Sequence, residues 1–267
     1  MAKNIAVDFK RPVAIFSLEM SNVQLVNRLI MNVCEIEGNK IRNGRLSPAE
    51  WNKLENKINI LRNAPIYVDD TPGLSVTELR SKARKLVKDK KIELIIIDYL
   101  QLMNANGFNF GSREQEVSII SRTLKGLAKE LDIPIIALSQ LSRAVEKRDS
   151  SNNTVDGKKP LLSDLRESGA IEQDADMVCF IHRPEYYKLY DDGNGKDLRG
   201  LGQIIVAKHR NGATDEIWLR FIGKYTRFQN ESDTFDQDEN IYADIQYNTQ
   251  QSRMNMLPSE ADGASLN

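Results

Sequence analysis

The sequence predicts an α/β fold, in which a mostly parallel, twisted sheet is flanked by helices. Two observations in the 267 residues support this: short β-branched runs alternate with longer stretches of helical periodicity, and several helical stretches open with explicit start signals. Parallel strands that are buried on both faces read as short apolar runs. The strands are expected at residues 13–16, 66–68, 94–97, 135–138, 177–181 and 204–207, with residues 216–221 adding an antiparallel hairpin near the end.

Four of the expected helices begin at a serine that is followed three residues later by Glu or Gln. In this capping box the two side chains satisfy backbone N–H groups that the first turn of a helix leaves free. The four serines are Ser21, Ser47, Ser75 and Ser112. The helix expected over residues 113–131 has one apolar stripe, formed by Val117, Ile120, Leu124, Leu127 and Leu131.

Charge is distributed unevenly along the chain, whose formal net charge is −1. Residues 229–267 contain eight acids and a single base, Arg253, which gives this segment a charge of −7 and leaves +6 on residues 1–228. We therefore expect one domain over residues 1–228 and an acidic, disordered tail over residues 229–267. A basic domain suits a polyanionic partner, although many ordinary enzymes are equally basic.

The two cysteines, Cys34 and Cys179, lie far apart in apolar surroundings, which favours reduced core residues over a disulfide or a metal pair. No apolar run approaches the roughly 18 residues of a membrane span, and the amino terminus lacks the apolar core of a signal peptide. We therefore expect a cytoplasmic protein without a membrane partner. Residues 1–12 are expected to form the last turns of a helix, so the sheet is expected to begin at its second strand.

Polar residues with catalytic potential follow three of the expected strands. Asp98 ends an apolar run, where a carboxylate can hold Mg²⁺ through its water shell beside a triphosphate, or can simply cap a turn. Glu19 can be the general base that orients water onto a phosphate, or an acid that precedes the helix at Ser21. Gln140 can sense a γ-phosphate through its amide, and its alternative role is that of a turn residue.

Two further segments carry cations. Lys208 and Arg210 stand just before Asn211-Gly212, which predicts a hairpin turn, and a guanidinium exposed there can reach a phosphate on an adjacent subunit. Residues 163–176 are polar and contain glycine, so their backbone amides and Arg166 can approach a phosphodiester closely. The alternative for this second segment is a solvated loop that leads into a short helix.

The sequence contains no phosphate-binding loop of the form G-x-x-x-x-G-K-[ST]. Its three Gly-Lys pairs begin at Gly157, Gly195 and Gly223, and they are followed by Lys159, Asp197 and Tyr225 rather than by serine or threonine. These residues therefore do not encode the cradle of backbone N–H groups and the lysine that hold β- and γ-phosphates in such loops.

Taken in order, these motifs resemble those of the bacterial DnaB-type replicative DNA helicases, over residues 5–228. The matching segments are residues 16–20, 94–102, 137–143, 165–176 and 208–212. The resemblance implies a RecA-like motor domain whose copies form a hexameric ring around single-stranded DNA, with ATP and Mg²⁺ bound between neighbours. It also implies ATP-driven 5′-to-3′ unwinding during DNA replication, with primase and a helicase loader as further expected partners.

The resemblance also implies roles for individual residues. Glu19 would be the catalytic base, Asp98 the Walker B acid that holds Mg²⁺ through water, and Gln140 the γ-phosphate sensor. Lys208 and Arg210 would be inserted into the nucleotide site of the next subunit. The DNA backbone would be held by a central loop that contains Arg166, Glu167 and Gly169.

The sequence departs from the family pattern at its start. Relatives carry a first strand and a P-loop before the helix that ends here near Ile5, and this sequence contains neither. We therefore expect a truncated chain that does not hydrolyse ATP alone. One alternative function is an ATPase-inactive module that only binds DNA or a neighbouring subunit. Another is a RecA-like recombination or clock-type ATPase, against which residues 99–102 and the Arg166 loop argue.

Overall fold

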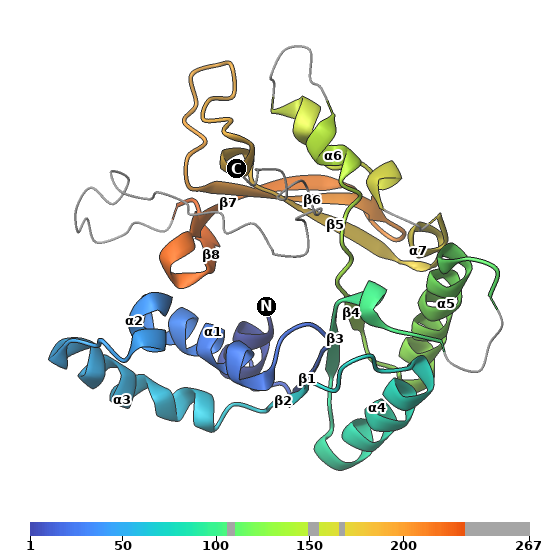
Figure 1. Ribbon diagram of the computed structural model, residues 1–267, viewed down its shortest axis with the longest axis horizontal. Coiled ribbons are helices and arrows are strands. Elements are labelled where there is room, and N and C mark those ends of the chain that lie inside the picture. The colour runs from blue at the N-terminus through green and yellow to red at the C-terminus, as the bar shows by residue number, and fades with distance from the viewer. Residues whose placement is uncertain (106–109, 149–154, 166–168, 233–267) are drawn as a thin grey trace, which may run out of the picture. The chain divides into compact units, whose positions relative to one another are not determined.

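Two four-stranded sheets organise the part of the chain that the structure describes (Figure 1). The computed structural model describes all residues except 106–109, 149–154, 166–168 and 233–267. The strands are β1 (Val13–Ser17), β2 (Ile66–Asp69), β3 (Leu94–Asp98), β4 (Ile135–Ala137), β5 (Met177–His182), β6 (Leu201–His209), β7 (Asp215–Ile222) and β8 (Arg227–Asn230). All seven expected strands are present, and β8 was not expected.

The first sheet is parallel throughout, with the strand order β2-β1-β3-β4. Strand β1 is buried at all five positions, and β3 is buried at three of its five positions. Burial on both faces explains why these strands read as continuous apolar runs in the sequence. The predicted fold class, a parallel sheet flanked by helices with antiparallel strands toward the end, is confirmed.

The second sheet is antiparallel, in the order β5-β6-β7-β8, and is larger than the single expected hairpin. Along β5 exposed and buried residues alternate, so one face of this strand is covered and the other is not. Cys179 lies on the exposed side, and its prediction as a core residue was wrong, whereas Cys34 is buried. Because Met177–His182 is almost entirely apolar, its sequence does not reveal the alternation.

The four serine-capped helices are confirmed as α1 (Asn22–Cys34), α3 (Pro48–Arg62), α4 (Val76–Lys90) and α5 (Arg113–Leu131). The first three have complete capping boxes, whereas Ser112 alone caps α5. A serine cap contributes on the order of 1 kcal/mol.

The shorter elements are the π-helix η1 (Asn4–Asp8), the helices α2 (Gly38–Asn43), α6 (Ala144–Lys147) and α7 (Gly169–Asp174), and the 3₁₀ turns η2 (Leu100–Leu102), η3 (Asp156–Lys158), η4 (Leu162–Asp164), η5 (Pro184–Tyr187) and η6 (Gly223–Tyr225).

The main hydrophobic core lies between the parallel sheet and the helices α4 and α5, which lie side by side in Figure 1. The predicted stripe of α5 supplies four buried residues to it, and Leu131 packs partly buried against its edge. A second cluster joins β1 and β3 to η1 through Ala6, Val13, Ile15 and Leu94. The helical prediction for the first residues of the chain is therefore confirmed.

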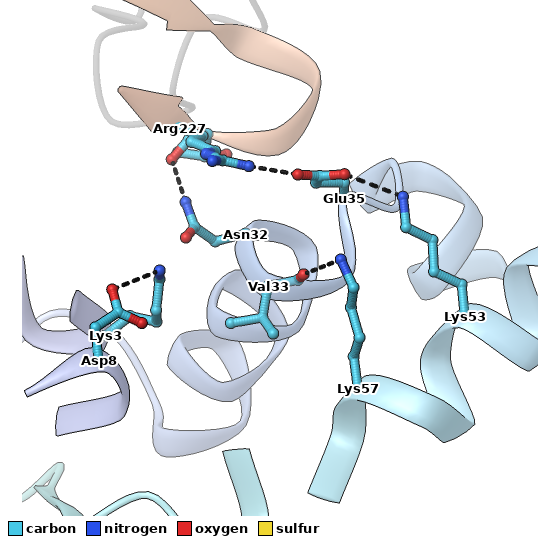
Figure 2. Close-up of polar contacts among 9 residues, drawn as sticks. Lys3, Asp8, Asn32, Val33, Glu35, Lys53, Lys57 and Arg227 are labelled. Atoms are coloured by element: carbon cyan, nitrogen blue, oxygen red, sulfur yellow. Dashed lines mark hydrogen bonds and ion pairs between the residues drawn. The ribbon is translucent and has the colours of Figure 1, made fainter. Parts of the chain in front are cut away.

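Glu35 connects α1 and α3 to the start of β8 (Figure 2). Its carboxylate pairs with Arg227 and accepts a hydrogen bond from Lys53 at 3.1 Å, while Asn32 donates to the Thr226 carbonyl at 3.3 Å. Burial alone raises the pKa of Glu35, but the hydrogen bond from Lys53 and the surrounding cations bring that pKa below its ordinary value. Glu35 is therefore an ionised carboxylate, and it joins residues of α1 and α3 to Arg227, which is distant in sequence.

Residues Met1–Glu231 form one compact unit. In the described part of this unit, no helix combines the length and the apolar character that a membrane crossing requires. The acidic tail expected over residues 229–267 lies outside the described residues from position 233 onward. Its disorder and the domain boundary at residue 228 stay predictions.

Candidate active site

The carboxyl ends of β1, β3 and β4 bring three predicted site segments to one edge of the parallel sheet. Ser17 pairs in register with Asp98, and Ile97 pairs with Ala137. Beyond the strands, the Leu18 N–H donates to the Asp98 carbonyl at 2.7 Å, and the Leu138 N–H donates to the Ile97 carbonyl at 2.9 Å. The segments that carry Glu19, Asp98 and Gln140 therefore follow three adjacent strands, where open α/β sheets bind ligands.

Local hydrogen bonds hold the turn that carries Glu19. The Ser17 hydroxyl donates to the Met20 carbonyl at 2.7 Å, and the Asn22 N–H at the start of α1 donates to the Asp70 carboxylate at 2.8 Å. Glu19 itself is exposed. An exposed carboxylate on a fixed turn is available to orient a water molecule, which is what a general base at this edge requires.

Gln101 is a site residue that the sequence did not single out. Its Nε2 donates to the Ser139 hydroxyl at 2.8 Å and to the Gln140 carbonyl at 3.3 Å, and its Oε1 accepts from the Gln140 N–H at 3.2 Å. It therefore connects the segment after Asp98 with the segment that carries Gln140. The only signal in the sequence was its place three residues after Asp98, within the same matching motif.

Arg113 anchors the same segment to the start of α5. It donates to the carbonyls of Gln101, at 2.6 Å, and Met103, at 3.1 Å. It also pairs with Glu116, whose Oε1 accepts from the Ala105 N–H at 3.0 Å. The backbone that follows Asp98 is thus held from both sides, by α5 and by the segment after β4.

Lys208 and Arg210 lie in and just beyond the end of β6, on the second sheet, and contact their own chain. Lys208 donates to the Glu172 carbonyl, and Arg210 donates to the Gln173 carbonyl at 2.9 Å. Arg210 also pairs with Asp176 at 3.2 Å. The predicted hairpin turn is present between β6 and β7. The structure therefore does not bring these two cations into the group formed by the segments of Glu19, Asp98 and Gln140.

The predicted DNA-contact residues are only partly described. Arg166 and Glu167 lie outside the described residues, and Gly169 is the first residue of α7. Before this segment, Leu165 forms an antiparallel bridge with Leu141, the neighbour of Gln140. The predicted DNA segment therefore starts next to the predicted phosphate sensor.

The residues present are suited to holding the Mg²⁺ ion of a nucleotide site, but not to holding the phosphates of the nucleotide. In the described portion of the chain, no group of three or more His, Cys, Asp or Glu side chains can enclose a metal ion. A single half-buried carboxylate such as Asp98 suits Mg²⁺, which keeps several water molecules and takes its other oxygens from phosphates. The amides and the lysine of a phosphate cradle have no matching pattern in the sequence.

A parallel sheet with two acids and an amide at or just beyond the ends of adjacent strands, accompanied by an antiparallel sheet, has the RecA-like fold of helicase ATPase domains. The model of the DnaB-like helicase C-terminal domain family matches residues 1–230, and the chain belongs to this family.

Curated relatives and solved structures agree with this assignment. The replicative DNA helicase DnaB of Geobacillus stearothermophilus is 46% identical over 237 residues, which are 89% of this chain and 50% of the relative. The replicative DNA helicase DnaC of Bacillus subtilis is 44% identical over 88% of this chain and 49% of its own length. The chain thus spans about half the length of these relatives.

Two solved structures share the fold. One is an isolated ATPase domain with a TM-score of 0.75 and 38% identity, and the match covers 86% of this chain and 77% of that domain. The other is a DnaB-like replicative helicase, whose structure was described together with its interactions with primase. It has a TM-score of 0.74 and 38% identity over 86% of this chain and 52% of its own.

Proposed function

We propose that this chain is the larger part of the motor domain of a replicative DNA helicase. In the intact helicase, ATP hydrolysis at the subunit interfaces of a hexameric ring drives 5′-to-3′ translocation on single-stranded DNA and duplex unwinding in the cytoplasm. Primase and a helicase loader are the further partners of this proposal. The DnaB-type family and its replicative relatives support it.

One observation carries the proposal: the segments of Glu19, Asp98 and Gln140 follow three adjacent strands that are paired in register. In this proposal Asp98 holds Mg²⁺ through water, Glu19 orients the attacking water, and Gln140 responds to the γ-phosphate. Mg²⁺, when bound, neutralises phosphate charge. Lys208 and Arg210 serve the neighbouring subunit's nucleotide, and the DNA backbone is held by Arg166, Glu167 and Gly169.

We further propose that this chain alone does not hydrolyse ATP, because its sequence contains no G-x-x-x-x-G-K-[ST] loop. Without that cradle the β- and γ-phosphates are not positioned for attack, and positioning together with electrostatic stabilisation supplies most of the catalysis of phosphoryl transfer. A second candidate function follows, in which the chain binds DNA or a neighbouring subunit without ATPase activity. The pairing of Lys208 and Arg210 within their own chain is compatible with it.

The catalytic part of the proposal is tested by measuring the release of phosphate from ATP in the presence of Mg²⁺. The purified chain and its Asp98→Ala variant are expected to give the same background rate. Turnover in the unmodified chain that disappears in Asp98→Ala contradicts the proposed inactivity, and it supports the role of Asp98 at the same time.

Fluorescence anisotropy with labelled oligothymidylate tests the DNA part. Binding is expected to weaken as salt rises, because phosphate contacts release counterions. Arg166→Ala is expected to lower the affinity and to reduce the salt slope by about 1. Arg199→Ala is the matched control, since Arg199 pairs with Asp197 in a different loop. Equal losses in both variants contradict the assignment of Arg166, and absence of binding contradicts the DNA part altogether.

A further inference from the structure

Asp176 lies among basic side chains that come from two different elements. One oxygen of its carboxylate pairs with Arg210 at 3.2 Å, and the other pairs with Lys125 of α5. The hydrogen bond from Lys125 is the main reason that the pKa of Asp176 lies below its ordinary value, and the charges of Arg210 and Lys129 lower that pKa further. An ionised carboxylate is therefore surrounded by Lys125, Lys129 and Arg210, which we call the α5–β6 cation cluster.

The two lysines of the cluster are placed by a helix that is anchored in the main core. Lys125 and Lys129 lie four residues apart on α5, so they extend from the same face of that helix. On either side of Lys125, Leu124 and Leu127 are buried in the core. The side chain of Lys125 keeps only 25% of its full exposure. A cation on such a rigid element can hold a ligand at a defined position.

The third cation of the cluster is held at the end of β6. The guanidinium of Arg210 donates to the Gln173 carbonyl at 2.9 Å, and the Arg210 N–H donates to the Asp176 carbonyl at 2.8 Å. Since Arg210 and Lys125 pair with different oxygens of the same carboxylate, they lie on opposite sides of it. The cluster therefore presents a guanidinium and an ammonium group that converge on one small anionic group.

The carboxylate of Asp176 occupies a position that suits a phosphate group. A phosphate also carries several oxygens on one atom, and it has more charge with which to bind a guanidinium and an ammonium group. The side chains of Arg210 and Asp176 keep 49% and 55% of their full exposure, so water and salt screen their ion pair. A phosphate that reaches the cluster can therefore compete with Asp176 for both cations.

Three converging cations favour a terminal phosphate over the phosphodiester of DNA. A terminal phosphate has three acceptor oxygens and a charge of about −2, which can serve Lys125, Lys129 and Arg210 together. A phosphodiester carries a single charge and fewer free oxygens. The chemistry of the cluster therefore matches the end of a polyphosphate chain.

We propose that Lys125, Lys129 and Arg210 form a binding site for the terminal phosphate of a polyphosphate, in which Lys125 contacts the phosphate and Asp176 competes with it. The inference rests on the proposed function for the source of the ligand, because the nucleotide of a neighbouring subunit supplies that phosphate. It goes beyond the proposed function by adding α5 to the elements that contact nucleotide. The site is built from residues of one chain, so the isolated chain can be used to test it.

Isothermal titration calorimetry with inorganic triphosphate tests the site. Asp176→Asn is expected to raise the affinity by about threefold to tenfold, because it removes a nearby like charge. Lys125→Met is expected to lower the affinity by about threefold to tenfold, because it removes one charge-assisted hydrogen bond. Lys125→Arg, which keeps the charge, is expected to retain binding. Lys53→Met is the matched control, since Lys53 forms its ion pair with Glu35.

Three outcomes of the calorimetry overturn the inference. The first is an unchanged affinity in Lys125→Met, and the second is an equal loss in Lys125→Met and Lys53→Met. The third is the absence of triphosphate binding in both the unmodified chain and Asp176→Asn. Equal thermal unfolding midpoints confirm that the variants are folded.

Competition with oligothymidylate separates the two sources of phosphate. Triphosphate is expected to shift the NMR signals of the Arg210 guanidinium, and oligothymidylate is expected to leave these shifted signals unchanged. DNA that displaces triphosphate from Arg210 assigns the cluster to phosphodiesters and overturns the inference. A chain that binds DNA but no triphosphate also overturns it and leaves the proposed function standing. A chain that binds triphosphate but no DNA contradicts the DNA part of the proposed function and supports the site.

Discussion

Gln101 contacts both backbone groups of Gln140 through the two polar atoms of a single side-chain amide. Its Nε2 lies 3.3 Å from the Gln140 carbonyl oxygen, and its Oε1 lies 3.2 Å from the Gln140 nitrogen. Two hydrogen bonds to one planar amide restrain the orientation of the Gln140 backbone as well as its position. The segment after β3 and the segment after β4 are therefore expected to move together.

Gln101→Ala is expected to loosen Gln140 with little loss of fold. Loss of these hydrogen bonds should lower the free energy of unfolding by about 1 kcal/mol, and hydrogen–deuterium exchange of the Gln140 N–H should accelerate. Gln115→Ala is the matched control, because the Gln115 side chain accepts from the Gly111 N–H at 2.8 Å and does not contact Gln140. Slow exchange at Gln140 in the Gln101 variant contradicts the prediction.

The centre of β3 is expected to carry a large share of the stability. Ile95 is fully buried in the main core, so Ile95→Ala leaves a cavity and should cost about 2–5 kcal/mol in the free energy of unfolding. Ile217→Ala in β7 makes the same chemical change at a side chain that is 47% exposed, and should cost much less. Denaturant titration measures both, and similar losses in the two variants would argue against this placement of the core.

Acid is expected to weaken the start of α3. The hydrogen bond from Lys40, followed by those from Ser47, lowers the pKa of Glu50 from 4.5 to about 2. A carboxyl whose pKa is lower in the folded state stabilises that state above its unfolded pKa. This contribution is lost as pH falls from 4.5 toward 2.

Glu50→Gln should therefore be less stable than the unmodified chain at neutral pH, and the difference should shrink through this acid window. Denaturant titrations at stepped pH measure the difference. Glu55→Gln controls for the loss of one charge from the same helix. A difference between Glu50→Gln and the unmodified chain that stays constant with pH contradicts the assignment.

Glu35 has a left-handed backbone conformation and also forms ion pairs. Two substitutions separate the effects of these two features on stability. Its φ of +52° is costly for residues other than glycine, by about 1–2 kcal/mol. Glu35→Ala removes the contacts to Arg227 and Lys53 and keeps this backbone cost, whereas Glu35→Gly removes both.

Glu35→Ala should therefore be the less stable variant by about 1 kcal/mol in denaturant titration. Arg227→Met, which deletes only one partner of the same carboxylate, reports the ion-pair part separately. Equal stability of the alanine and glycine variants would show that the backbone conformation contributes nothing.

The helices and the parallel strands were predictable because their signals are local. A serine and a glutamate or glutamine three residues apart determine where α1, α3 and α4 begin, and the stripe of α5 has helical spacing. The antiparallel pairing of β5 was not predictable, because its apolar run lacks the alternation of polar and apolar residues that is typical of a strand covered on one face. Strand β8 escaped prediction as well, since Arg227–Asn230 is short and mostly polar.

In the candidate site, the order along the chain predicted that Glu19, Asp98 and Gln140 lie near one edge of the sheet, since Asp98 ends a strand and the other two follow shortly after one. The contact of Gln101 with Gln140 depends on the pairing of β3 with β4, which the sequence does not specify. The contacts of Lys208 and Arg210 with α7 likewise depend on how the second sheet lies against α7. The roles of these residues stay predictions, and their partners across elements could not be predicted from the sequence.

The bond between Arg227 and Glu35 also bears on the order in which the protein can mature. Its two residues stand 192 positions apart, so a ribosome has released α1 long before it adds β8. Contacts between such distant positions must overcome a large loop-closure entropy, and they form late. During synthesis, therefore, Glu35 at the end of α1 cannot pair with Arg227 until almost the whole described chain has emerged.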